Sequence, residues 1–313
     1  MILPIVGGGY LGWSLGANDA SNVFGTAVGS RMLSFRTAAF LCSFFLLAGA
    51  VLEGHRGIHT LDSLTVLGAG PAGLAAVAAA LTVTVMTLLK LPISASQAAV
   101  GAILGIGIMQ QQLDLGGLGK VVLCWLGTPL GAMLLAAVLY PVLAWLYNRL
   151  KLDMYRHDRF LRLGLVLVGS YGAYALGANN VANVGAFMLA SGAMGTATAA
   201  LVGGACIVLG VITFSRGVMQ TVGRGLASLD AFSSLVVILA EAATVHFYAK
   251  VGVPVSTSQA VVGAVVGVGL VRSVGTLRLK PLRNVACGWL LTPALSCLLS
   301  MLLYLVTHLQ YVG

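Results

Sequence analysis

Long apolar segments fill most of the chain, and short polar or basic stretches separate them. The first half has apolar segments at residues 2–15, 35–52, 64–89, 93–109 and 121–146, and the second half has them at 161–176, 198–214, 232–248, 255–271 and 285–306. A helix that crosses the hydrocarbon core of a bilayer needs about 20 apolar residues. The pattern therefore predicts an all-α, polytopic membrane protein.

Three polar motifs interrupt these segments, and each occurs twice in the same order. GANDASN at 16–22 returns as GANNVAN at 177–183, PISASQ at 92–97 as PVSTSQ at 254–259, and WLGTP at 125–129 as WLLTP at 289–293. Each second copy follows the first by 161 to 164 residues. This indicates an internal duplication, with a first transmembrane repeat at 1–147, a linker at 148–162 and a second repeat at 163–313, all in one transmembrane domain.

The apolar segments beside the motifs are short and are broken by Gly or Pro. Irregular backbone is tolerated at membrane depth only where it is buried in protein or lines a cavity. Transporters use discontinuous helices of this kind at the bilayer midplane. We therefore expect discontinuous helices or re-entrant hairpins at the midplane.

Composition agrees with a membrane location, and charge predicts the orientation. The chain is 59% hydrophobic and 8% charged, whereas soluble domains are about 25% charged. The formal net charge is +9, and the basic residues lie in the stretches between apolar segments. This placement favours a signal for membrane topology over nucleic-acid binding. The linker carries Arg149, Lys151, Arg156, Arg159 and Arg162, so we expect it to be cytoplasmic.

Equivalent loops in the two halves have different charge. The stretch 271–283 carries three Arg and one Lys, whereas 110–120 carries one Lys and one Asp. Basic loops favour the cytoplasmic side, so these loops are predicted on opposite sides of the membrane. The halves are therefore expected to be inverted-topology repeats. Both termini of this multi-pass cell-membrane protein then lie on the non-cytoplasmic side.

Asp19 is an acid within a very apolar segment, and Asn18 and Asn22 flank it. Ionisable groups at such depth are expensive and usually functional. Carboxylate and amide oxygens suit hard cations such as Na⁺. A structural alternative is that these residues only hydrogen-bond neighbouring helices, but the recurrence of the motif favours a cation site.

PISASQ and PVSTSQ place Pro and hydroxyl residues just before apolar, Gly-rich segments. Pro and hydroxyl residues mark helix starts, and helix N-termini attract anions. Two such starts facing one another would offer donors to a tetrahedral oxyanion. The predicted donors are the hydroxyls of Ser94, Ser96, Ser256, Thr257 and Ser258, unless these residues serve only as ordinary caps.

The chain lacks the motifs of other functional classes. It has no GxxxxGK[ST] phosphate loop, and its five His residues show no metal-ligand spacing. No His or Cys lies beside the serine-rich motifs to activate a nucleophile. We therefore expect neither an enzyme nor a bound cofactor apart from a coupling ion.

The paired motifs resemble those of the inorganic phosphate transporter (PiT) family, which includes sulfate permeases. GANDASN and GANNVAN are similar to its GANDVAN signature, and PISASQ and PVSTSQ to its PVSTTH element. The resemblance covers essentially the whole chain and implies a secondary transporter that moves phosphate or a similar oxyanion with Na⁺ or H⁺. It implies cation ligands at Asn18, Asp19, Asn22, Asn180 and Asn183, with Na⁺ at Asp19, Asn22 and Asn183. It implies anion ligands at Ser94, Ser96, Gln97, Asn179, Asn180, Ser256, Thr257, Ser258 and Gln259.

The chain departs from this family pattern at several positions. The second signature carries Asn180 in place of Asp, and Gln97 and Gln259 replace the His of PVSTTH. His59 and Gln220 stand where family members often carry Glu before a Thr. Gating or proton-relay roles are therefore assigned to His59, Gln220 and Glu241, with His246 as a further relay candidate. Glu241 could equally make only a polar contact.

These departures affect the predicted substrate. Phosphate near neutral pH carries a proton that a carboxylate can accept in a hydrogen bond, whereas sulfate carries none and would be repelled. Because carboxylates are lost, sulfate becomes an alternative substrate. Phosphate remains the first prediction because Asp19 is retained. The sequence thus predicts an alternating-access symporter of inorganic phosphate driven by Na⁺ or H⁺, with a sulfate permease as the alternative and an anion channel as the rival class. Lipid is an expected partner, nucleic acid is not, and a homodimer is left open.

Overall fold

The computed structural model describes all residues except 1, 65–66, 89–92, 226–228, 273–278 and 313, and at 221–225, 279–287 and 309–312 it describes the backbone alone. The described residues form twelve helices and no strand. In chain order these are α1 (Ile2–Gly29), α2 (Phe35–Glu53), α3 (His55–Asp62), α4 (Ala69–Leu88), α5 (Ala95–Gln110), α6 (Leu115–Arg149), α7 (Met154–Leu189), α8 (Thr196–Thr213), α9 (Ser215–Gly225), α10 (Ala231–Val251), α11 (Thr257–Arg272) and α12 (Leu279–Val312). The predicted all-α class is confirmed.

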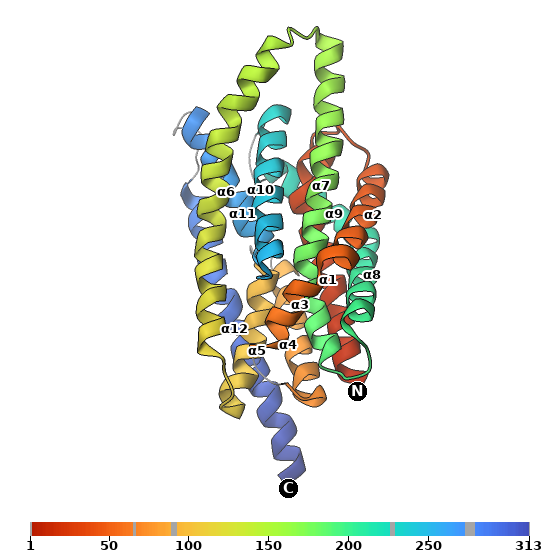
Figure 1. Ribbon diagram of the computed structural model, residues 1–313, viewed down its shortest axis with the longest axis vertical. Helices are drawn as coiled ribbons and strands as arrows, with labels where there is room; N and C mark the ends of the chain where they lie inside the picture. The colour runs from red at the N-terminus through yellow and green to blue at the C-terminus, as the bar shows by residue number, and fades with distance from the viewer. Residues whose placement is uncertain (1, 65–66, 89–92, 226–228, 273–278, 313) are drawn as a thin grey trace.

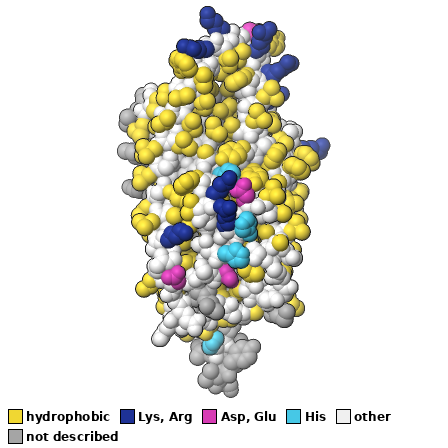
Figure 2. Space-filling model, viewed as in Figure 1, with side chains coloured by type: hydrophobic (Ala, Val, Ile, Leu, Met, Phe, Trp, Pro, Cys, Tyr) yellow, Lys and Arg dark blue, Asp and Glu magenta, His cyan; other side chains and the backbone are white. Residues whose placement is uncertain are grey.

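Seven of the described helices are long and apolar enough to cross a membrane. They are α2, α4, α6, α7, α8, α10 and the part of α12 at Gly288–His308. Apolar side chains also cover much of the outer surface, whereas basic side chains gather at the upper end, where the α6–α7 connection lies (Figures 1 and 2). The chain is therefore a multi-pass membrane protein.

Two pairs of helices that correspond between the halves run in opposite directions. In Figure 1, α1 rises from the lower end while α7 descends from the upper end, and α6 and α12 are opposed in the same manner. Consequently α1 begins and α12 ends at the same end of the molecule. This is the arrangement that an inverted duplication would give. The sides of the membrane on which these ends lie stay a prediction, as does the exact division at 147 and 163.

The halves interlock through matching glycine contacts. A Cβ on Gly16 of α1 would lie 1.8 Å from the Ile207 carbonyl oxygen of α8, and a Cβ on Gly177 of α7 would lie 1.9 Å from the Leu46 carbonyl oxygen of α2. Small residues permit this close approach of helix backbones in membranes. Both contacts join one half to the other, so the motif-bearing helices α1 and α7 are each held by the opposite half.

Two helical hairpins bring the PISASQ and PVSTSQ motifs into the interior. In the first hairpin α4 packs against α5, and in the second α10 packs against α11. Helices α5 and α11 have 16 residues each, which is too short for a full crossing. Each is buried along most of its length and packs on a long helix, α5 on α12 and α11 on α6. The predicted interruption of the membrane-spanning helices at PISASQ and PVSTSQ is therefore present.

The expected interruption at the GAN motifs was wrong. Helix α1 is continuous through GANDASN and α7 is continuous through GANNVAN, so both extend well beyond the predicted segments 2–15 and 161–176. Gly and Asn lower helix propensity, but here tertiary packing of both helices outweighs that cost. Two other predictions cannot be compared with the structure. Pro92 lies outside the described residues, and most of the basic stretch 271–283 lies outside the described residues or side chains.

Candidate functional site

The two GAN motifs meet in the interior. Asn180 Nδ2 donates to Asp19 Oδ2 at 2.7 Å, and Asn18 Nδ2 donates to Asp19 Oδ1 at 2.9 Å. Asn179 Nδ2 donates to Asn180 Oδ1 at 2.8 Å, which repeats the Asn18–Asp19 bond in the second half. Asp19, Asn179 and Asn180 are all buried. A single carboxylate therefore lies at the contact between the halves, within a set of amides.

The hairpin tips meet beside this contact and bind one another reciprocally. Ser96 Oγ donates to the Val255 carbonyl at 2.9 Å, and Ser258 Oγ donates to the Ile93 carbonyl at 2.7 Å. The serines and the carbonyls correspond between the repeats, each pair being separated by 162 residues. The duplication thus places both predicted helix starts at one point.

The hydroxyls that begin these helices act as N-caps, as the sequence predicted. Ser94 Oγ accepts from the Gln97 backbone N–H, and Ser256 Oγ accepts from that of Gln259, each at 3.3 Å. Such caps satisfy amide groups that the first helical turn leaves unpaired. The Ser256 and Ser258 hydroxyls also share a bond of 2.9 Å.

Asparagines of the GAN motifs connect each half to the hairpin of the other. Asn22 Nδ2 donates to Thr257 Oγ1, and Asn183 Nδ2 donates to Ser96 Oγ, both at 3.0 Å. Thr257 also lies beside Asp19. Movement of either hairpin would therefore disturb the surroundings of Asp19.

The two half-sites are not equally closed. Asn179 bonds both backbone groups of Val255, accepting from its N–H at 2.8 Å and donating to its carbonyl at 2.9 Å. Asn18, its counterpart, is only half-buried, as is Asn22, whereas Asn183 is fully buried. The second hairpin is thus firmly tied to α7, and the less closed part of the site lies beside α1.

Several buried oxygen atoms near the motifs have no hydrogen-bond partner among the described residues. They are Oε1 of Gln97, Oδ1 of Asn183, Oε1 of Gln259 and Oε2 of Glu241. An unpaired buried acceptor costs about 1–3 kcal/mol. Oxygen atoms of this kind together with the Asp19 carboxylate form a donor set that suits a hard cation.

The predicted anion donors lie close together. Ser94 and Ser256 accept backbone N–H groups as helix caps. Ser96 and Ser258 donate across the hairpin tips, so the hydrogens of these two hydroxyls are already engaged. An oxyanion bound at this point would have to replace the two cross-tip bonds. Binding of an anion to the Ser96 and Ser258 hydroxyls would therefore require the tips to separate.

The predicted relay residues lie in three different places. Glu241 of α10 is 2% exposed and close enough to Asp19 for their charges to interact. His59 is exposed on α3, and Gln220 lies half-buried on α9. Glu241 is therefore the relay candidate that borders the central site.

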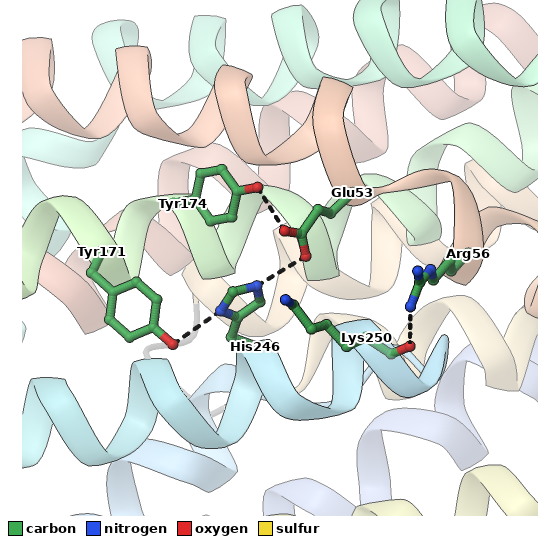
Figure 3. A network of polar contacts seen from close by, with 6 residues as sticks. All are labelled: Glu53, Arg56, Tyr171, Tyr174, His246 and Lys250. Carbon is green, nitrogen blue, oxygen red and sulfur yellow. Dashed lines mark hydrogen bonds and ion pairs between the residues drawn. The ribbon is translucent and has the colours of Figure 1, made fainter.

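His246, the further relay candidate, belongs to a polar network that the sequence did not predict. Glu53, Tyr171 and Tyr174 join this residue, and Arg56 and Lys250 lie beside it (Figure 3). The available signal was an acid at the end of an apolar segment, but its partners lie about 120 to 190 residues away.

Comparisons with known proteins agree with this architecture. The phosphate transporter family matches residues 15–300. A relative from Methanocaldococcus jannaschii named "Putative phosphate permease" is 27% identical over 94% of this chain and 93% of its own length. The sulfate permease CysP of Bacillus subtilis is 26% identical over 94% of this chain and 84% of its own. The names of these two relatives refer to phosphate and to sulfate, the two oxyanions that the sequence predicted.

A solved structure has the same fold. It is described as "The sodium-dependent phosphate transporter", with a TM-score of 0.86, 23% identity and coverage of 98% of both chains. The sequence resemblance is thus confirmed by a family match that includes both GAN motifs and both hairpins. This chain belongs to the phosphate transporter family and is a membrane transport protein, not an enzyme.

Proposed function

We propose that the chain is a symporter of inorganic phosphate that works by alternating access. The main support is the contact of Asp19 with Asn180 at 2.7 Å, beside two hairpin tips that bind one another. Alternating access requires one central site between two opposed halves, each able to open toward one side, and this contact supports such a site. Exchange of the cross-tip bonds for bonds to the anion would couple binding to hairpin movement.

Na⁺ is the proposed driving ion, held by Asp19 with the oxygens of Asn22 and Asn183. The unpaired Oδ1 of Asn183 and the carboxylate of Asp19 support this assignment. The word sodium in the name of the structural neighbour agrees with it. H⁺ is the alternative coupling ion, with Glu241 as its carrier.

Sulfate is the alternative substrate. Asp19 and Glu241 are the buried carboxylates among the described residues, so repulsion of a fully ionised anion is limited. The name of the Bacillus subtilis relative supports the same alternative. Phosphate stays first because a retained carboxylate can accept its proton in a hydrogen bond.

Radiolabelled uptake into proteoliposomes tests the proposal. We expect phosphate to accumulate above its external concentration when an inward Na⁺ gradient is imposed, and to equilibrate without one. Equilibration under every gradient would identify a channel instead, because a channel cannot concentrate its ion. Accumulation of sulfate with no accumulation of phosphate would establish the alternative substrate.

Gln259→Glu is expected to reduce sulfate uptake about tenfold more than phosphate uptake. The substitution adds a carboxylate at a buried, unpaired oxygen of the site with little change in shape. Sulfate cannot donate to that carboxylate, and a tenfold change corresponds to about 1.4 kcal/mol. The measurement is the ratio of the two uptake rates, with Gln110→Glu at the far end of α5 as the control. An unchanged ratio would contradict an anion position near Gln259.

A further inference from the structure

A second polar cluster lies away from the central site, where the end of α2 meets α7 and α10. His246 Nε2 lies 2.9 Å from Glu53 Oε2, and Tyr171 Oη lies 3.0 Å from His246 Nδ1. Tyr174 Oη donates to Glu53 Oε1 at 2.9 Å. The side chains of His246 and Glu53 are 15% and 28% exposed. The acid, the imidazole and two phenols thus form one connected network near the protein surface (Figure 3).

The network is able to gain or lose a proton without losing a hydrogen bond. When the imidazole is neutral, Nε2–H donates to Glu53 and Nδ1 accepts from the Tyr171 hydroxyl. When it is protonated, Nδ1–H donates to the same hydroxyl oxygen, which can accept as well as donate. Since Glu53 keeps the Tyr174 hydroxyl in both states, no polar group becomes unpaired. Protonation also converts a net negative pair into a neutral one, which is favourable in an apolar environment.

The duplication shows that this junction does not need charge to fold. The counterparts of Tyr171 and His246, which lie 161 and 162 residues earlier, are Tyr10 and Thr84. They share a hydrogen bond of 2.8 Å.

The counterparts of Tyr174 and Glu53 are also uncharged. They are Trp13 and Phe214, whose ring centroids are 5.5 Å apart. One fold therefore builds the same junction twice, once with aromatic and hydroxyl groups and once with an acid and an imidazole. The second version supplies a protonatable pair that the packing does not require.

The pair is joined to the segments that form the central site. Tyr174 lies three residues before Gly177 of GANNVAN, and His246 lies eight residues before Pro254 of PVSTSQ. Glu53 precedes Gly54, where a Cβ would lie 2.0 Å from a side-chain carbon of Val181. Protonation at the network therefore acts on both α7 and the α10–α11 hairpin.

Two cations also border the network. Lys250 extends toward the pair from α10, and its charge acts on Glu53 (Figure 3). Arg56 of α3 donates from Nη1 to the Lys250 carbonyl at 2.9 Å. The charged and titratable groups that face the pair are thus Glu53 of α2, Arg56 of α3, Tyr171 and Tyr174 of α7, and His246 and Lys250 of α10.

We propose that Glu53 and His246 form a proton-binding site that fastens the α10–α11 hairpin to α2 and α7 and thereby makes transport depend on pH. The transport part rests on the proposed function. The bound proton favours the packed arrangement described above, and its loss leaves a negative charge that favours exposure of Glu53 to water. Uptake is faster in the protonated state because the hairpin is then held in register with the central site.

Uptake into proteoliposomes from about pH 5 to pH 8 tests the effect on transport. At a fixed Na⁺ gradient, wild-type uptake rises as the pH falls, by at most about tenfold per pH unit for one proton. His246→Gln removes this dependence, and Glu53→Gln alters it because the imidazole loses its carboxylate partner. The matched control is Thr84→Val in the first half, which keeps the wild-type profile. A uniform loss of uptake at every pH in both variants, with the wild-type midpoint retained, would overturn the proposal.

Direct titration of His246 separates this inference from the proposed function. The histidines are labelled with ¹⁵N in protein held in lipid nanodiscs, and the signal lost in His246→Gln identifies this residue. The pH response of this signal is expected to differ between the wild type and Glu53→Gln, because the substitution removes the carboxylate that faces His246 Nε2. Failure of wild-type uptake would reject the proposed function, whereas a signal that does not titrate, or is unaffected by Glu53→Gln, would reject the proton site.

Discussion

Replacement of Asp19 by Asn is expected to abolish cation-coupled uptake, with a loss of about a hundredfold or more. Asp19 is 4% exposed and accepts hydrogen bonds from Asn18 and Asn180. The substitution removes the negative charge on which the proposed Na⁺ site depends and turns one acceptor into a donor that faces donors. A hundredfold loss corresponds to about 2.7 kcal/mol. The measurement is initial phosphate uptake with and without a Na⁺ gradient.

Asp114→Asn is the control for this substitution. Asp114 is exposed at the start of α6 and accepts from the Gly116 N–H at 3.0 Å, which an amide oxygen can also do. Uptake should therefore stay at the wild-type level. If the Asp19→Asn protein retained uptake with the same Na⁺ dependence, the assigned role of Asp19 would be wrong.

The contact between the halves permits a stricter test of the same idea. In the double variant Asp19→Asn with Asn180→Asp, the carboxylate moves to the other partner of the 2.7 Å hydrogen bond. The pair keeps one carboxylate and one amide, so the charge of the site is restored close to its original position. We expect recovery of about tenfold over Asp19→Asn alone.

Gly177→Ala is expected to prevent stable packing of the two halves. The new Cβ would lie 1.9 Å from the Leu46 carbonyl oxygen, which is backbone and cannot rotate away. Helices α2 and α7 would have to separate, and overpacking of this severity costs about 3 kcal/mol or more. The expected result is a lower yield of monodisperse protein and a lower unfolding temperature in detergent.

Gly119→Ala provides the matched comparison. A Cβ at Gly119 of α6 meets nothing within 4 Å, and Ala is a better helix former than Gly by about 1 kcal/mol. This variant should unfold at the wild-type temperature or above it. Equal unfolding temperatures for the two variants would show that the close approach at Gly177 is not needed.

The importance of the two GAN motifs was predictable because the motif occurs twice in the chain. The family resemblance grouped Asp19 with Asn180 as ligands of one cation site, and the structure brings these residues within hydrogen-bond distance. Ser94 and Ser256 cap their helices as expected. Each inference used local chemistry, namely the cost of polar groups in apolar surroundings and the preference of hydroxyls for helix starts.

The predictions from the sequence were wrong where the local conformational preference of a segment disagreed with its long-range packing. Gly in GANDASN suggested a break, yet α1 continues through the motif because Gly16 lies against the backbone of α8. The hydroxyls of Ser96 and Ser258 seemed free to bind an anion, but each donates to a carbonyl of the opposite hairpin. Those partners are about 160 residues distant and leave no local trace in the sequence.

The sequence by itself determined that the chain is an all-helical membrane protein with two related halves, because apolar length and motif recurrence are properties of the chain alone. Tertiary structure decided which donors are occupied, which oxygens lack partners, and that Glu53 meets His246 although 192 residues lie between them. The physical reason is that a hydrogen bond requires two groups within about 3 Å. Only the packing of helices from both halves determines which groups satisfy that requirement.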